Sequence, residues 1–425
     1  MDNQNILRFS SNLLKNVINS FNLQKDVDNN QLIKEFDKLE NFFIKSYALV
    51  SPSFDAYRVG NRPKKRLLII ILIKMFGGFI SFLRCVIAIS FNTPLIAWLT
   101  SDAFYIMGNR YIISLIMASG AIGMCIVIGG FTILMDMKSD LVAIEYFHEM
   151  KAKIVSGFVS EKYRKKFYRQ LRFTTKYISW PLLLFLCMNA TMVFSLPPII
   201  AYFMPDTNYS VPNIIFWTIC TVVLCYDFYV SLFSMFILIY LCSIFLKYNF
   251  DQVNDDIQES FMKNDKIKLK KSIVEHNSLC MTTAKLNILF RKYILILYII
   301  CKPGLNSLLF ASLSPESNAI SRLTTTSMFI ITTFLILTIN IICSSISCSA
   351  HKPIPTLYKI SIYMKLPLSL NLKVRGLIDK LSGPKIGIYC SDLYPMTSYE
   401  LYKDIWSFAT IYLLLNTFIN ALKQN

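Results

Sequence analysis

Seven long apolar blocks constrain this chain more than any other feature of its sequence. Each block has 18 to 35 residues, and about 20 apolar residues in a helix cross the ~30 Å hydrocarbon layer of a membrane. Lipid offers backbone amides no hydrogen-bond partner, so such a block must be helical. Only 16% of the residues are charged, against about 25% in a typical soluble protein. The sequence therefore predicts an all-α membrane protein whose seven transmembrane helices are Leu67–Phe91, Tyr111–Met135, Trp180–Phe203, Val211–Phe245, Tyr293–Leu313, Leu323–Ile346 and Ile405–Leu422.

The lysines and arginines between these blocks alternate strongly from one loop to the next. Of the 44 in the chain, 11 precede the first block, and the loops after blocks two, four and six hold 10, 9 and 8. The three intervening loops hold only Arg110 and Arg322. Positively charged loops stay in the cytoplasm during insertion. This alternation predicts a cytoplasmic N-terminus and an extracellular C-terminus, the reverse of the orientation of a G-protein-coupled receptor.

The blocks and loops divide the chain into four predicted parts. Segment 1–66 is a polar, cytoplasmic segment without the pattern of a secretory signal peptide. Segment 67–346 contains helices 1 to 6 and their long cytoplasmic loops, and the length of its fourth block predicts a helix that continues below the membrane. Segment 347–404 is a cytoplasmic anchor segment that ends in the amphipathic run Lys385–Lys403, and segment 405–425 is the last helix with a short extracellular end.

The sequence has no pattern that indicates an enzyme, a metal site or a bound cofactor. His148, His276 and His351 are far apart in cytoplasmic segments, where we expect each to be solvated. There is no nucleotide-binding glycine-rich loop, and the net charge of +18 follows particular loops rather than a nucleic-acid-binding motif. No cysteine lies in a predicted external loop, so no extracellular disulfide is expected. Asn208 begins a glycosylation tripeptide in such a loop, although chance explains this tripeptide equally well.

Charged side chains inside the predicted spans are the next candidates for function. A charge at the centre of a membrane helix costs about 2.5–3.5 kcal/mol, so it should face a partner or a cavity. Asp227 and Lys302 have opposite charge and comparable depth, which is consistent with either a structural ion pair or a shared ligand cavity. Aromatic and amide side chains near the outer ends usually anchor the helix at the interface, but they can also form a pocket for a small polar ligand. The candidate pocket residues are Arg84, Asn189, Trp217, Asp227, Lys302 and Asn306.

The last block carries small and hydroxyl side chains along one face. At helical spacing this face comprises Ser407, Thr410, Leu414, Thr417 and Ala421, and Phe418 lies beside Thr417 near the outer end. Such a face either allows close helix packing or lines a pore, and the residues alone do not distinguish the two.

The C-terminal third carries a resemblance to a known family. Arthropod gustatory receptors typically end in Thr-Tyr, five apolar residues and Gln-Phe. The corresponding run here keeps Thr410 and Phe418, with Ile411 in place of Tyr and Thr417 in place of Gln. The upstream run 387–390, Gly-Ile-Tyr-Cys, is also similar to that family. The chain thus resembles arthropod gustatory receptors, within the superfamily of seven-span ligand-gated ion channels that includes insect odorant receptors; the first 270 residues match only in layout.

This resemblance implies a tetrameric cation channel in the plasma membrane of chemosensory cells. Four copies of the last helix would surround a pore for cations, with the gate at Thr417 and Phe418, and a small-molecule tastant would bind in the outer half of helices two to six. The cytoplasmic parts of helices four to six and Lys385–Lys403 would join the subunits, in a homotetramer or with related receptors. A receptor coupled to a cytoplasmic signalling partner and a transporter remain alternatives. Ligand identity is not encoded in any pattern found here.

Overall fold

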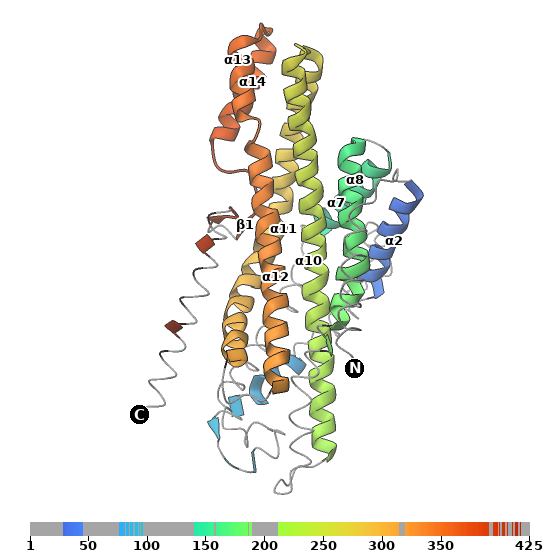
Figure 1. Cartoon of the computed structure of the whole chain (residues 1–425), viewed down its shortest axis with the longest axis vertical. Helices are drawn as coiled ribbons and strands as arrows, with labels where there is room; N and C mark the ends of the chain where they lie inside the picture. The colour runs from blue at the N-terminus through green and yellow to red at the C-terminus, as the bar shows by residue number, and fades with distance from the viewer. Residues whose placement is uncertain are drawn as a thin grey trace, which may run out of the picture.

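The computed structural model describes residues 29–45, 140–156, 159–185, 187–188, 211–313, 319–390 and 394–397, together with short runs and single residues within 76–96 and 399–417. The axis of the molecule is formed by three long helices, α10 (Val211–Met262), α11 (Lys266–Leu313) and α12 (Ala319–His351), which pack side by side (Figure 1). Their 52, 48 and 33 residues correspond to about 78, 72 and 50 Å at 1.5 Å per residue. Each helix is therefore much longer than a membrane is thick.

These three helices confirm the helical assignment of the fourth, fifth and sixth apolar blocks. As predicted, α10 continues well past the apolar block, to Met262. By length and composition alone, two stretches of the described helices could cross a membrane, Phe233–Met262 and Thr325–Tyr363. The block Tyr111–Met135 and its loops lie outside the described residues.

The turn between α10 and α11 is fixed by two polar residues. Asn264 has a positive φ of 52°, a conformation that asparagine adopts more readily than most residues. Asp265 accepts hydrogen bonds through Oδ1 from the backbone amides of Ile267 (3.0 Å) and Lys268 (2.9 Å), which caps the start of α11. The two helices consequently form an antiparallel hairpin at the end of the molecule that is predicted to be cytoplasmic.

A lateral layer packs against this axis. It consists of α2 (Asn29–Lys45), α7 (Asp140–Val155), α8 (Glu161–Phe173) and the π-helical segment η2 (Thr174–Leu182) (Figure 1). In α2, apolar residues at helical spacing are fully or almost fully buried, namely Leu32, Phe36, Leu39 and Phe43. The ring of Phe36 lies 5.5 Å from that of Phe147 in α7 and 6.2 Å from that of Phe167 in α8. The predicted N-terminal segment thus contributes a helix to the core.

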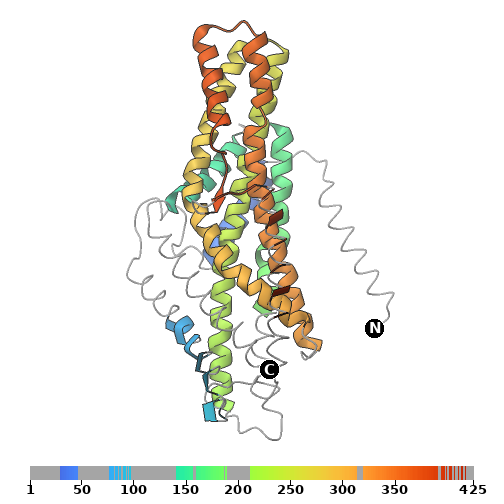
Figure 2. The same cartoon turned by 90° about the vertical axis from the view of Figure 1, so that its left-hand side faces the viewer.

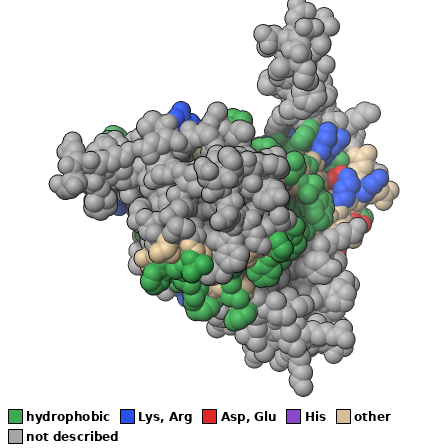
Figure 3. Space-filling model, turned by 90° about the horizontal axis from the view of Figure 1, so that it is seen from below, with side chains coloured by type: hydrophobic (Ala, Val, Ile, Leu, Met, Phe, Trp, Pro, Cys, Tyr) green, Lys and Arg blue, Asp and Glu red, His purple; other side chains and the backbone are tan. Residues whose placement is uncertain are grey.

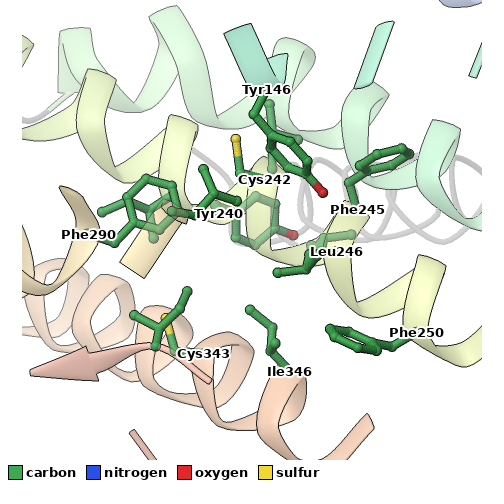
Figure 4. Packing of buried hydrophobic residues seen from close by; sticks show 14 of the residues in the cluster. Tyr146, Tyr240, Cys242, Phe245, Leu246, Phe250, Phe290, Cys343 and Ile346 are labelled. Atoms are coloured by element: carbon green, nitrogen blue, oxygen red, sulfur yellow. The ribbon is translucent and has the colours of Figure 1, made fainter. Parts of the chain in front are cut away.

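The core is centred on α10, which lies between the lateral layer and α12 (Figure 4). Phe245 of α10 stacks edge-on against Phe167, with ring centroids 5.6 Å apart. Phe290 of α11 and Cys343 of α12 are completely buried in the same cluster. All residues from Phe233 to Leu246 are buried, as expected for a helix that is apolar all round and surrounded by others.

The chain after α12 folds back on the long helices. α13 (Ile354–Tyr363) and α14 (Leu368–Ser382) form a helical hairpin, and α14 packs on α11. Figure 2 shows this hairpin at the same end of the molecule as the α10–α11 turn. A two-stranded antiparallel hairpin follows, in which β1 (Tyr389–Cys390) pairs with β2 (Tyr394–Pro395). These strands were not anticipated in the amphipathic run.

Candidate functional site

Two of the predicted pocket residues are in contact. The guanidinium of Arg84, in a helical turn of the first predicted span, lies over the ring of Trp217 in α10, 4.5 Å from its centroid. Trp217 is also packed edge-on against Phe216, with centroids 5.3 Å apart. A cation over a tryptophan face contributes about 0.5–2 kcal/mol, more where water is excluded. This contact joins the first predicted span to the beginning of α10.

The Arg84–Trp217 contact lies near the end of the molecule that is predicted to be extracellular. Trp217 is six residues from the start of α10 at Val211, or about 9 Å along the helix. Figure 3 shows this end with hydrophobic side chains gathered over the described surface. On α10 these include Ile215, Phe216, Ile219 and Val223, each more than half exposed. Such a surface fits contact with lipid around a partly buried cation and ring.

For the other predicted pocket residues, the structure describes no side-chain contact. Asp227 is on α10, and Lys302 and Asn306 are on α11, two helices that pack against each other. The positions of their side chains lie outside the described part of the structure, so the Asp227–Lys302 pair stays a prediction. Asn189 and Asn208 lie outside the described residues.

The last predicted span is described at scattered positions. The hydroxyl groups of Thr410 and Thr417 donate to the carbonyl oxygens of Trp406 (3.1 Å) and Leu413 (2.9 Å), four residues earlier. This is the usual behaviour of a threonine in a membrane helix. Ser407, Phe418 and Ala421 of the predicted pore face are outside the described residues.

The described side chains of this last segment are all exposed. Exposed fractions are 74% at Trp406 and 64% at Leu414, and Thr410 and Thr417 are exposed as well. Figure 1 shows the described positions of this segment apart from the packed helices. Within one copy of the chain, these side chains therefore have open surroundings.

The run 387–390 holds the chain before this last segment against the helix bundle. The backbone amide of Tyr389 donates to Oδ1 of Asn287 in α11 (2.8 Å), and Ile388 and Cys390 are buried. A Cβ on Gly387 would come within 3.2 Å of the Cβ of Ser347 in α12. The close approach explains glycine at this position. The sequence motif is thus a docking point from which the last segment extends.

The expectation that all three histidines are solvated is wrong for His276, which is completely buried in α11. Its Nε2 lies 3.1 Å from the carbonyl oxygen of Ala350 in α12 and donates to it, so Nδ1 is free to accept from the Cys280 thiol at 3.5 Å. Burial, with a smaller contribution from the charge of Lys380, lowers the pKa of His276 to about 4. His276 therefore links α11 to α12 in its neutral form.

His276→Gln should reduce the acid sensitivity of the folded chain. In the unfolded chain this histidine has a pKa near 6.5, whereas in the folded chain its pKa is about 4. Between these two pH values the unfolded chain binds a proton that the folded chain does not, so the free energy of unfolding decreases as the pH falls from about 6.5 to about 4. The loss between pH 7 and pH 5 is about 2 kcal/mol. Thermal unfolding of the detergent-solubilised chain at both pH values measures it. An equal pH dependence in the glutamine variant would contradict this role.

A second buried polar contact was also missed by the sequence analysis. The hydroxyl of Tyr298 in α11 donates to Oδ1 of Asn340 in α12 over 2.6 Å, and both side chains are buried. Such interhelical hydrogen bonds in membranes contribute about 0.6–1.7 kcal/mol. The signal was available, because Asn340 is the one amide side chain in the predicted span Leu323–Ile346.

Comparison with known proteins gives a likeness of fold. No protein-family profile matches the chain, and no curated protein matches it. Among solved structures, the insect olfactory receptor OR5 from Machilis hrabei in complex with eugenol aligns with a TM-score of 0.68 and 13% sequence identity, over 92% of this chain and 100% of the receptor. A second structure of that receptor aligns with a TM-score of 0.59 and 12% identity, over 81% of this chain and 87% of the receptor.

The chain therefore has the all-α membrane-protein fold of an insect olfactory receptor, and not that of an enzyme. At 13% identity the likeness establishes the fold alone.

Proposed function

We propose that the chain is a chemoreceptor of the gustatory-receptor type, a ligand-gated non-selective cation channel opened by a small tastant. The observation that carries this proposal is the alignment with the whole length of an olfactory receptor whose structure holds eugenol. The degraded Thr-Tyr…Gln-Phe motif at the C-terminus favours the gustatory type. The orientation predicted from the basic loops supports the same assignment.

The exposed last segment supports a pore between subunits. Its described side chains between Trp406 and Thr417 are exposed within one copy of the chain. In a tetramer the same side chains would meet neighbouring copies and the pore. Threonine hydroxyls that bond to their own backbone, as at Thr410 and Thr417, still offer oxygen lone pairs to passing cations.

A row of exposed apolar residues on α11 supports subunit contact in the anchor region. We name Ile267, Val274, Met281 and Ile288 the α11 stripe; they are spaced by seven residues, and their exposed fractions are 86%, 55%, 58% and 47%. They lie before the predicted fifth span, where exposure would be to water rather than to lipid. A seven-residue apolar repeat is the pattern by which one helix packs on another. A second copy of the chain is the occupant that this row fits.

The tastant site is assigned to the outer half of the bundle, around Arg84 and Trp217. Their contact brings a cation and an aromatic face together, near the end of the bundle that is predicted to be extracellular. Aromatic walls with few polar groups are typical of sites for small molecules. Asn189, Asp227, Lys302 and Asn306 remain candidates for the polar part of this pocket.

Trp217→Ala tests this assignment in cells that express the chain alone and are screened with a panel of tastants. Loss of the ring removes an aromatic wall and its contact with Arg84, so the half-maximal ligand concentration should rise roughly tenfold, equivalent to ~1.4 kcal/mol. The matched control is Phe334→Ala, at an aromatic residue of α12 that is 60% exposed. An equal shift in both variants would contradict the pocket, and transport without ligand-evoked current would contradict the channel.

A further inference from the structure

Helix α8 carries a row of cations on the face that points away from the core. Four of its residues are buried: Tyr163, Phe167 and Leu171, which are spaced by four, and Tyr168. The cations follow at spacings of three and four on the other side and continue into η2. The row consists of Lys162, Lys166, Arg169, Arg172 and Lys176.

Most of this row has no ion-pair partner among the described residues. Lys162 pairs with Asp255 of α10 at 2.7 Å. Within the part of the chain that the structure describes, Lys166, Arg169, Arg172 and Lys176 have no carboxylate at ion-pair distance. Lys166 lies over the ring of Tyr163 and Lys176 over that of Tyr177, at 5.4 and 5.0 Å from the centroids. Nε of Arg169 is buried without a hydrogen-bond acceptor among the described residues. Four positive charges therefore lie along one side of the helix without a carboxylate partner among the described residues.

The row ends where the predicted third span begins. η2 runs from Thr174 to Leu182 without a break from α8, and the predicted span starts at Trp180. Lys176 is thus one turn before the hydrocarbon, and Arg172 about two turns. Clusters of four or more cations directly next to the cytoplasmic end of a membrane helix attract the anionic lipids of that leaflet.

We propose that Lys166, Arg169, Arg172 and Lys176 form a binding site for the headgroup of an anionic phospholipid in the cytoplasmic leaflet. Arginine pairs phosphate with two parallel hydrogen bonds, and lysine adds a point charge. The lipid is a structural ligand of the α8–η2 segment, distinct from the tastant and from the pore.

The burial of the apolar face favours lipid over a protein partner. A basic amphipathic helix also resembles the targets of calmodulin-like proteins, which enclose the apolar face of such a helix. Here that face is occupied, because Phe167 packs on Phe245 of α10 and Tyr163 lies beside Tyr248. Only the cations remain available. A planar anionic membrane surface can bind through these cations alone.

The test measures binding of short-chain lipids to the full chain purified in neutral detergent. Dioctanoyl phosphatidylinositol bisphosphate and dioctanoyl phosphatidylserine should bind, and dioctanoyl phosphatidylcholine should not. In the variant R169Q/R172Q/K176Q, three cations are lost at about fivefold each, so affinity should fall on the order of 100-fold.

Two further variants distinguish the loss of charge at this site from a general loss of charge and from misfolding. K359Q/K373Q/R375Q removes three exposed cations from α13 and α14, which lie apart from α8 in Figure 1, and should bind as the unaltered chain does. R169K/R172K keeps the charges and should bind within about threefold.

Three outcomes would overturn the proposal. The first is equal lipid affinity in R169Q/R172Q/K176Q and the unaltered chain. The second is that free inositol trisphosphate binds as tightly as the lipid, which would assign the site to a soluble phosphate. The third is a complex with calcium-loaded calmodulin that the same three substitutions abolish, which would assign the row to a protein.

Discussion

Replacing Val274 and Met281 together by glutamate should convert the proposed tetramer into single chains. Both side chains belong to the α11 stripe and are more than half exposed in one copy. Burying a large apolar side chain contributes about 1.5–3 kcal/mol, and burying an unpaired carboxylate costs several kcal/mol. In a symmetric tetramer each change acts in every subunit. The assembled fraction should therefore fall more than about tenfold, a shift of ~1.4 kcal/mol or more.

Mass measurement of the detergent-solubilised chain reports assembly, and whole-cell current reports function. The control is Ile362→Glu with Leu368→Glu, on α13 and α14, where the original side chains are 71% and 76% exposed. This pair adds the same charges outside the stripe and should leave both readouts near those of the unaltered chain. A stripe variant that remains fully assembled would show that the seven-residue repeat is not a subunit contact.

The long helices were predictable because their signal is local. An apolar block long enough to cross a membrane leaves few alternatives to a helix, and the blocks within α10, α11 and α12 were assigned as helices on that ground alone. From the residues themselves, their extension beyond the membrane was predicted only for α10, whose block is exceptionally long; for α11 and α12 it was implied by the family resemblance. Past the end of an apolar block, the residues that continue a helix are polar on one face and buried on the other, which is a weaker pattern.

Two elements could have been found from helical spacing. In α2, Leu32, Phe36, Leu39 and Phe43 recur at intervals of four and three, but the asparagine-rich composition of the first segment obscured them. In α11, Leu269, Ile273, His276 and Cys280 form a similar buried row, so His276 occupies a core position. The average composition of a segment does not reveal such a row, whereas the helical spacing of its apolar residues does.

The candidate site depends on contacts between segments that are distant in sequence. Arg84 and Trp217 were selected separately for depth and chemistry, and the structure brings them within 4.5 Å. The hydrogen bond between Tyr298 and Asn340 could not be predicted from the sequence, because it depends on how each of the two helices is oriented about its own axis. Depth along a helix follows from residue count. The face that meets a neighbour follows only from packing.

Phe418→Ala should open the proposed channel without ligand. The resemblance places the gate at Thr417 and Phe418, and a ring of phenylalanine side chains closes a pore by excluding water. Alanine widens that ring and removes much of its apolar surface. Current in the absence of ligand should rise at least about tenfold, equivalent to ~1.4 kcal/mol in the balance of closed and open states.

The matched control is Tyr412→Ala, which also replaces an aromatic side chain by alanine in the same segment. At about 100° per residue in a regular helix, position 412 would fall on the side opposite the predicted face of Thr410, Leu414 and Thr417. It should leave the baseline current low while the ligand response persists. A silent baseline in Phe418→Ala with normal surface expression would place the gate elsewhere, because a dewetted constriction cannot lose its aromatic ring and stay closed. A raised baseline in both variants would indicate loosened helix packing instead.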